Sequence, residues 1–284
     1  MNISNNKLNV STIPSALPVP TMPPVLYESP SCIVLNKSCG QAVEGASGSV
    51  LDLPALLKDT YGTVVNREGN PFSPTAVHRL DVPVTGCALF ARTPQALAFL
   101  NDCFAQALAR KTYWAIVEKQ GVSVLAQEGE LVHWIAVDNR HNKSYAHAEE
   151  GPQRKQAKLR YRIVGEGDHY IFLEIELITG RHHQIRAQLA AIGLHIKGDL
   201  KYGSRRSEKN GGIRLHARSL AFPDPDHLDN LDSSSDAVRT HDARALNPST
   251  VHATELPRPY IQVVAPIIEP DRLWLAFKQA VGQN

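Results

Sequence analysis

The clearest pattern along the chain is an alternation of apolar side chains between residues 170 and 177. Four of them fall on one face of an extended segment: Ile171, Leu173, Ile175 and Leu177. A period of two predicts a β-strand with that side buried. Short apolar runs predict further strands at 31–36, 87–91, 113–118 and 260–264.

Helical spacing follows two of these strands. Thr93 and Pro94 predict a helix start, because a hydroxyl caps the first turn and proline suits the first helical position. The apolar stripe that follows is Leu97, Leu100, Phe104 and Leu108. A second helix is predicted from about Arg181 to Gly193, and its stripe is Ile185, Leu189 and Ile192. Further helices are predicted at 50–60 and at about 271–281.

The order of these elements indicates the fold class. Residues 137–160 are polar and rich in His, Lys and Arg, which predicts a loop or a ribbon. Strands and helices are mixed without a regular βαβ rhythm, and the sequence has no internal repeat. An α+β fold is therefore favoured over a doubly wound one.

Two segments lack the apolar content that a packed core needs. Residues 1–24 contain five prolines among polar residues, which predicts a flexible or extended tail. Residues 224–256 are acidic, rich in serine and short of aromatic residues, which predicts a disordered or loosely ordered insertion. We expect residues 25–284 to form one domain that carries this insertion.

The composition excludes several classes of protein. The 284 residues are 43% hydrophobic, which supports a substantial core and excludes wholesale disorder. No apolar run approaches the length that spans a bilayer, and the first residues lack the pattern of a signal peptide. The four cysteines form no CxxC pair, which argues against a zinc site or a redox motif. Isolated thiols fit a cytoplasmic protein.

The net charge of +2 hides an asymmetry. Residues 224–256 hold seven acidic and two basic side chains, so this segment carries −5 and the remainder +7. A moderately basic body is compatible with a polyanionic partner such as nucleic acid. Surface charge that serves solubility alone is the commoner explanation.

Asp81 is the first candidate for chemistry. It ends the run His78-Arg79-Leu80-Asp81, directly before the turn VPVTG at 82–86. A carboxylate on a rigid turn between core elements can serve as a nucleophile or a general base. By itself, the same pattern more often marks a structural aspartate that caps a turn.

A dense set of hydrogen-bond donors lies at the predicted strand-to-helix junction: Arg181, His182, His183, Gln184 and Arg186. His182 and Arg186, four residues apart, would share one helical face. The two histidines would point about 100° apart, so they would not readily bind one metal ion. Tyr113, at the head of a predicted strand, either packs in the core, which is commoner, or stacks on a base.

Five motifs occur in a single order: HRLDxxxTG, KTY, TGRHHQIR, GLHIKGDLKYG and LHARSLAF. Together they resemble the RluA-type pseudouridine synthase family over about residues 25–222, with a weaker match at 260–268. The resemblance implies an antiparallel-rich mixed sheet flanked by helices and loops, with a catalytic cleft across it. It also implies conversion of specific uridines to pseudouridine in structured RNA, either ribosomal or transfer RNA, with no metal and no cofactor.

The resemblance assigns roles to individual residues. Asp81 falls on the aspartate that initiates cleavage of the glycosidic bond, and Tyr113 on the tyrosine that stacks on the target base. Arg186 falls on the arginine that pairs with the aspartate. We expect its guanidinium to stabilise the negative charge of Asp81 and to hold it by a two-pronged hydrogen bond. Leu215 falls on a segment beside the pocket.

Further residues are expected to contact the substrate. Arg79 either fills the place that the flipped uridine leaves or forms a structural salt bridge. Basic residues in 195–216 are expected to meet backbone phosphates. The complete set of expected substrate contacts is Arg79, Arg181, His183, Gln184, Leu215, Lys197 and Lys201.

The sequence departs from the family pattern in four places. Ser38 stands where proline is usual, and the turn after Asp81 is VPVTG where xxTSG is commoner; neither affects the chemistry. The 224–256 insertion has no counterpart, and residues 1–24 are too few for the small RNA-binding domain of many relatives. These two differences bear on substrate recognition.

Two other functions remain open at this point. One is an Asp81-dependent nucleoside hydrolase, and the other is a catalytically silent RNA-binding module with the same fold. In each case we expect a monomer in the cytoplasm with RNA as its partner and with no membrane contact.

Overall fold

The computed structural model describes residues 22–45, 50–65, 69, 71–119, 125–227, 259–268 and 270–282. Of the predicted tail (1–24), only residues 22–24 are described. Of the predicted insertion (224–256), only residues 224–227 are described. Within the described ranges, no helix is long and apolar enough to cross a membrane.

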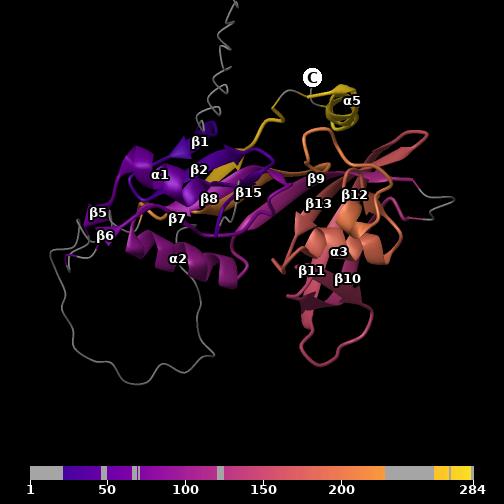
Figure 1. Cartoon of the computed structure of the whole chain (residues 1–284), viewed down its shortest axis with the longest axis horizontal. Coiled ribbons are helices and arrows are strands. Elements are labelled where there is room, and N and C mark those ends of the chain that lie inside the picture. Colours follow the sequence, from indigo (N-terminus) through magenta and orange to yellow (C-terminus); the bar gives the residue numbers. More distant parts are fainter. Residues whose placement is uncertain are drawn as a thin grey trace, which may run out of the picture.

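A twelve-stranded sheet forms the body of the described structure (Figure 1). Its path runs β1-β2-β8-β15-β9-β13-β12-β10-β11, and β14, β16 and β7 pair with β9, β15 and β8. The strands are β1 (Val25–Glu28), β2 (Cys32–Lys37), β7 (Thr75–Ala76), β8 (Thr85–Ala91), β9 (Arg110–Glu118), β10 (Glu128–Asp138), β11 (Lys143–His147), β12 (Lys155–Glu166), β13 (Tyr170–Leu177), β14 (His195–Ile196), β15 (Leu215–Pro223) and β16 (Tyr260–Val264).

Smaller elements complete the described fold. Two-stranded sheets join β3 (Gln41–Ala42) to β4 (Leu51–Asp52) and β5 (Val64–Val65) to β6 (Pro71–Phe72). The helices are α1 (Leu53–Tyr61), α2 (Pro94–Ala105), α3 (Gln184–Ala191), α5 (Arg272–Ala280) and the 3-10 turn η1 (Leu200–Tyr202). In the large sheet only β8 and β15 pair in parallel, which confirms the predicted α+β class with an antiparallel-rich mixed sheet.

Strand β13 shows how the sheet is covered on both faces. The four predicted side chains of its alternating face are buried in the main core, which also contains Ile185 of α3. Phe172 points the other way and packs with Trp274 and Phe277 of α5. Helices α3 and α5 therefore cover opposite faces of this strand (Figure 1).

Helix α2 begins where the sequence predicts. The Thr93 side chain accepts a hydrogen bond of 3.1 Å from the Ala96 amide, which caps the first turn. Leu100 is fully buried, but Leu108 lies beyond the end of the helix and is 41% exposed. The inclusion of Leu108 in the inward stripe is wrong, because the helix stops at Ala105 and the chain turns there.

The polar segment 137–160 forms the ribbon rather than the loop. Strands β10, β11 and β12 lie side by side in antiparallel register, with β10 between the other two. Its polar character follows from its place at one end of the sheet, where β11 is the edge strand. This ribbon places β11 beside α3.

Helix α3 begins three residues later than predicted. It starts at Gln184, because His183 has a left-handed backbone with a φ of 51°. Arg181 is therefore not in the first helical turn, and His182 does not share a helical face with Arg186. The end is near the predicted position, since Gly193 has a φ of 78°, but Ile192 is 37% exposed and not part of the buried stripe.

The parallel pair β8–β15 requires a glycine at position 86. Gly86 lies opposite Ala217 in the register and has a φ of 111°. A Cβ at this position would overlap with the backbone carbonyl of Ala217. Strands β15 and β8 can therefore approach each other directly after the Asp81 turn only because residue 86 is a glycine, which has no Cβ.

Gly86→Ala is expected to destabilise the fold by about 3 kcal/mol or more, because it adds steric overlap to backbone strain. Gly193→Ala is the matched control: its φ is also positive, but a Cβ there meets no atom within 4 Å. We expect about 1–2 kcal/mol for this control. Urea unfolding of both variants measures the difference, and equal losses would remove the steric argument.

Candidate active site

A cleft of about 570 Å³ lies between the loop before β8, the end of α2, the start of β9 and the turn before α3. Eight of the ten residues predicted for the site line it: Arg79, Asp81, Tyr113, Arg181, His183, Gln184, Arg186 and Leu215. These residues come from four separate stretches of sequence. Four of the five sequence motifs therefore contribute residues to this cleft.

Asp81 is carried on a turn whose carbonyl groups are all engaged. The Val84 amide donates to the carbonyl of Asp81 (3.0 Å), the Gly40 amide to that of Val82 (2.9 Å) and the Ile213 amide to that of Pro83 (3.1 Å). The turn is thus tied both to the segment after β2 and to the segment before β15. A carboxylate on such a support has a fixed position relative to the cleft.

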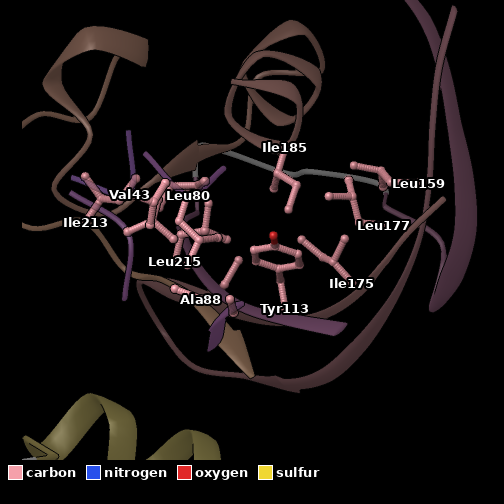
Figure 2. Close-up of a cluster of buried hydrophobic side chains, with 14 of the residues drawn as sticks. Val43, Leu80, Ala88, Tyr113, Leu159, Ile175, Leu177, Ile185, Ile213 and Leu215 are labelled. Atoms are coloured by element: carbon pink, nitrogen blue, oxygen red, sulfur yellow. The ribbon is translucent and has the colours of Figure 1, made fainter. Parts of the chain in front are cut away.

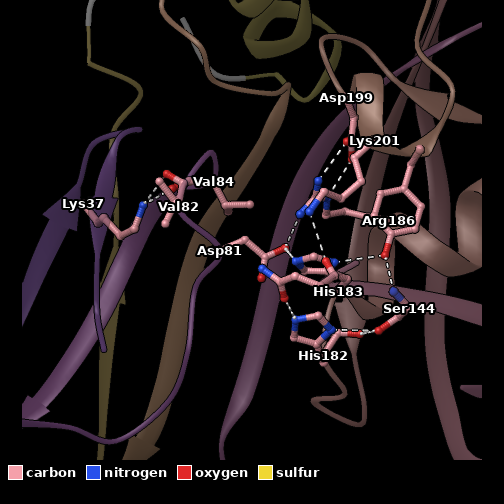
Figure 3. A network of polar contacts seen from close by, with 12 residues as sticks. Lys37, Asp81, Val82, Val84, Ser144, His182, His183, Arg186, Asp199 and Lys201 are labelled. Carbon is pink, nitrogen blue, oxygen red and sulfur yellow. Dashed lines mark hydrogen bonds and ion pairs between the residues drawn. The ribbon is translucent and has the colours of Figure 1, made fainter. Parts of the chain in front are cut away.

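Lys37 reinforces this turn from the interior. Its side chain is fully buried, and its Nζ donates to the carbonyls of Ser38 (3.0 Å), Val82 (3.1 Å) and Val84 (2.5 Å), as Figure 3 shows for the two valines. Burial lowers the pKa of Lys37 to about 7, although the charge of Asp81 raises it. Lys37 therefore binds the main chain of the turn that directly follows Asp81.

His78 anchors the segment before Asp81 to the sheet. Its Nε2 accepts a hydrogen bond of 3.2 Å from the Leu89 amide, and its ring stacks on Phe104 at 5.3 Å. Burial lowers the pKa of His78 to about 3. His78 is thus a neutral structural residue that positions the loop.

Arg186 joins two carboxylates in the floor of the site (Figure 3). Its Nη1 donates to Asp81 Oδ2 at 2.8 Å, while its Nε and Nη2 donate to the two oxygens of Asp199 at 2.7 and 2.8 Å. The predicted pair of Arg186 with Asp81 is present, but the predicted two-pronged bond to Asp81 is wrong. The fork binds Asp199, because that carboxylate faces the side of the guanidinium with two parallel N–H groups.

A hydrogen-bonded chain behind His183 connects the site to the edge strand β11. His183 Nε2 lies 3.6 Å from Asp81 Oδ2, and its Nδ1 lies 3.0 Å from the hydroxyl of Tyr202. That hydroxyl accepts a bond of 2.8 Å from the Ser144 amide. The His182 ring stacks on that of His183, with 3.8 Å between centroids.

Of the two environments predicted for Tyr113, the structure shows packing in the core, and stacking on a base stays a prediction. Its ring is 6% exposed and packs in the main core with Leu80, Ile175 and Leu215, while it also lines the cleft (Figure 2). Burial, together with the charge of Asp81, raises the pKa of its phenol. The hydroxyl therefore stays protonated near pH 7.

Gln184 holds the turn before α3 rather than facing the cleft alone. Its Oε1 accepts from the Thr179 hydroxyl (2.8 Å) and the Arg181 amide (2.9 Å), and its Nε2 donates to the Lys158 carbonyl (3.0 Å). It is 3% exposed. A structural role accounts for all of these contacts.

Two arginines remain open to solvent at the cleft. The Arg181 side chain is exposed and donates from Nε to the Gln156 carbonyl at 3.0 Å. The Arg79 side chain is 67% exposed, and its Nε lies 3.7 Å from Glu44 Oε2. An exposed pair of this kind contributes little to stability, so Arg79 is free to move.

The two predicted lysines lie outside the cleft lining. Lys201 is exposed beside the histidine pair and donates to the Asn142 carbonyl at 3.0 Å. Lys197 lines a different cavity and forms an ion pair with Glu208. Only Lys201 is therefore near the entrance to the site.

Four residues of the site were missed by sequence reasoning: Lys37, Ser144, Asp199 and Tyr202. Asp199 and Tyr202 belong to the motif GLHIKGDLKYG, and that motif was the signal that could have found them. The structure adds that Asp199 is buried, and a buried carboxylate needs a charged partner. Lys37 and Ser144 gave no such signal, because only the folded chain brings them to the turn and to the histidines.

The chemistry of the cleft follows from its charged groups. Among the described residues that line it, Asp81 is the only carboxylate, and Arg79, Lys111, Arg181 and Arg186 are cationic. Within the same part of the chain, no group of three potential metal ligands is placed to hold an ion. One carboxylate in a cationic cleft suits attack on, or proton removal from, an anionic substrate.

Comparisons with known proteins agree with this geometry. The sequence model of the RNA pseudouridylate synthases matches residues 31–191. An uncharacterised RNA pseudouridine synthase of Zymomonas mobilis is 32% identical over 197 residues, which cover 69% of this chain and 85% of that protein. A Rickettsia felis protein named ribosomal large subunit pseudouridine synthase C is 30% identical over 202 residues, and the match covers 70% of this chain and 62% of the relative.

A solved structure shows the same fold at lower sequence identity. Human RNA pseudouridylate synthase domain containing 4 has a TM-score of 0.57 with this chain and 19% identity. The match covers 92% of this chain and 94% of the human chain.

Proposed function

Because the chain belongs to the RNA pseudouridylate synthase family, whose members are isomerases, we propose that its cleft converts uridine in RNA to pseudouridine and that Asp81 initiates the reaction. The observation that carries this proposal is the isolation of Asp81. It is the single carboxylate among the described residues of a cationic cleft, and its turn is anchored on both sides.

The reaction breaks the N-glycosidic bond of uridine, turns the base and joins its C5 to C1′ of the ribose. The hydrogen on C5 then leaves as a proton and N1 takes up a proton, so the product is an isomer and no oxidant, reductant or group donor is consumed. Asp81 supplies the negative charge that must act at the ribose. Arg186 orients it through Oδ2, and the wall formed by Tyr113 and Leu215 supports the base.

The target uridine must leave its helical stack before it enters the cleft, which costs a few kcal/mol. We propose that Tyr113 offsets part of this cost by stacking on the base. Arg79, exposed and only weakly paired with Glu44, is free to occupy the vacated place in the RNA. The names of relatives such as the Rickettsia protein support ribosomal RNA as the substrate to test first and transfer RNA as the second.

We further propose that the chain acts as a monomer in the cytoplasm. Asp81, Tyr113 and Arg186 of one copy line the same cleft, which supports the monomer as the form to test first.

The proposed reaction is tested with RNA that carries tritium on C5 of uridine. Isomerisation releases the tritium into water while the RNA chain keeps its base. A nucleoside hydrolase would instead release labelled uracil, and a silent RNA-binding module would release neither. We expect tritium in water only. Labelled uracil would instead establish the hydrolase. Hydrolysis of a glycosidic bond commonly uses two carboxylates, and the described cleft lining has only one, so we do not expect this outcome.

RNA affinity is expected to depend on Arg181 and Lys201. Replacing either with alanine removes an exposed cation at or beside the cleft, so RNA should bind more weakly and the slope of log affinity against log salt should fall by about 0.7–0.9. Lys197→Ala is the matched control, because Lys197 is paired with Glu208 in another cavity. Binding curves at several salt concentrations measure all three variants. An equal effect of Lys197→Ala would argue against RNA binding on the side of the cleft that carries Arg181 and Lys201.

A further inference from the structure

His183 approaches the same carboxylate oxygen that Arg186 binds. Its Nε2 is 3.6 Å from Asp81 Oδ2, while Arg186 Nη1 is 2.8 Å from that atom. The histidine is 9% exposed and has a φ of 51°, a conformation that residues other than glycine rarely adopt. The surrounding structure therefore imposes this position on the ring.

The contact at the other ring nitrogen indicates where the imidazole proton resides. The Tyr202 hydroxyl, 3.0 Å from His183 Nδ1, already accepts a hydrogen bond from the Ser144 amide. An amide can only donate, so the phenol proton remains available for another acceptor. Within the described residues that acceptor is His183 Nδ1.

The two neutral tautomers of His183 have unequal environments. With the proton on Nδ1, the Tyr202 proton would lack an acceptor, and the Nε2 lone pair would face a carboxylate oxygen. With the proton on Nε2, Tyr202 donates to Nδ1 and the Nε2–H points toward Asp81. Burial lowers the pKa of His183 to about 3, although the charge of Asp81 raises it, so the ring is neutral near pH 7.

We propose that His183 is a positioning residue for Asp81, fixed as the Nε2–H tautomer by Tyr202. The Nε2–H of His183 and the Nη1–H of Arg186 both point toward Oδ2 of Asp81, which leaves Oδ1 as the oxygen that faces the ribose. The stack of His182 on His183 fixes the ring plane. The positioning role requires that this 3.6 Å separation shorten to a hydrogen bond in the complex with RNA. This inference rests on the proposed isomerisation, which supplies the reaction that Asp81 must be aligned for.

The tautomer is tested by NMR on protein labelled with ¹⁵N at its 12 histidines, without RNA. Two-bond ¹H–¹⁵N correlations distinguish Nε2–H from Nδ1–H, and the His183 signals are assigned by their loss in His183→Gln or His183→Asn. We expect Nε2–H in the wild type and a mixture of tautomers in Tyr202→Phe, where Nδ1 has lost its donor. An Nδ1–H ring in the wild type would overturn the proposal.

The positioning role is tested by comparing His183→Gln with His183→Asn. The glutamine amide reaches the position of Nε2 and keeps a donor toward Asp81, whereas the asparagine amide reaches the position of Nδ1 and keeps only the Tyr202 contact. Asparagine, however, suits the left-handed backbone better. A merely structural histidine therefore predicts that Asn is tolerated at least as well as Gln.

We expect the opposite order for catalysis. His183→Asn should lower the single-turnover rate at saturating RNA by about 100-fold, the scale of a misaligned reacting group, and His183→Gln by less than about tenfold. RNA affinity should be unchanged in both variants, and the melting temperature of His183→Asn should be higher than that of His183→Gln. Equal or reversed rates would overturn the proposal. A wild-type protein that isomerises no RNA would instead refute the proposed function, and the NMR result would still decide the tautomer.

Discussion

Asp81→Asn is expected to abolish isomerisation, with a fall in the single-turnover rate of at least about 10⁴-fold, the scale for removing a nucleophile. The substitution is nearly isosteric, and its amide oxygen can still accept the hydrogen bond from Arg186 Nη1. Arg186 also keeps its fork on Asp199, so its charge stays balanced. The fold and the affinity for RNA should therefore remain close to those of the wild type.

The measurement is tritium release under single-turnover conditions, accompanied by thermal unfolding and an RNA-binding curve. Asp102→Asn is the matched control, because it makes the same change in charge at an exposed position on α2. We expect this control to have full activity. Near-normal turnover of Asp81→Asn would rule out Asp81 as the initiating residue.

Arg186→Lys is expected to lower the rate at saturating RNA by about 100-fold while affinity changes by less than about threefold. The arginine is 5% exposed, and each of its three nitrogens donates to Asp81 or Asp199, so it is poorly placed to act as a phosphate clamp at the surface. Lysine keeps one positive charge but cannot hold two carboxylates in fixed directions at once. Asp81 would lose its orientation, and a buried ion pair would be weakened.

Arg181→Lys provides the comparison for this second variant. Arg181 is exposed and makes one side-chain bond, to the Gln156 carbonyl, so lysine should preserve most of its function. Single-turnover rates measured beside binding curves at several salt concentrations separate the two roles. If Arg186→Lys bound RNA poorly but turned over normally at saturation, Arg186 would be a binding residue, and Arg181 would be the next candidate for catalysis.

Local patterns predicted those parts of the fold that local interactions determine. The alternation in 170–177 gave strand β13 with its bounds, and Thr93 with Pro94 gave the start of α2. The start of α3 was placed too early, because 181–183 contain no residue that excludes a helix. The left-handed backbone of His183 is imposed by its neighbours in the fold, and those neighbours are distant in sequence.

The same distinction holds for the site. Asp81, Tyr113 and Arg186 lie in motifs that identify a family, and the fold does bring them to one cleft. The partner of the arginine fork was missed, since Asp199 belongs to a separate motif whose spatial relation to Arg186 depends on the path between α3 and η1. Lys197 and Lys201 are equally good candidates in the sequence, but their environments differ in the fold. Lys197 forms an ion pair with Glu208, whereas Lys201 is exposed and donates to the Asn142 carbonyl.

The place of β15 in the sheet has a consequence for synthesis of the protein on the ribosome. This strand lies between β8 and β9, although it follows both by about a hundred residues in the chain. Until it emerges from the exit tunnel, residues 85–86 of β8 and 110–115 of β9 lack the strand that pairs with them, and the Asp81 turn lacks its tie to Ile213. The nascent chain should therefore depend on chaperones until this late insertion, and the active site should form only afterwards.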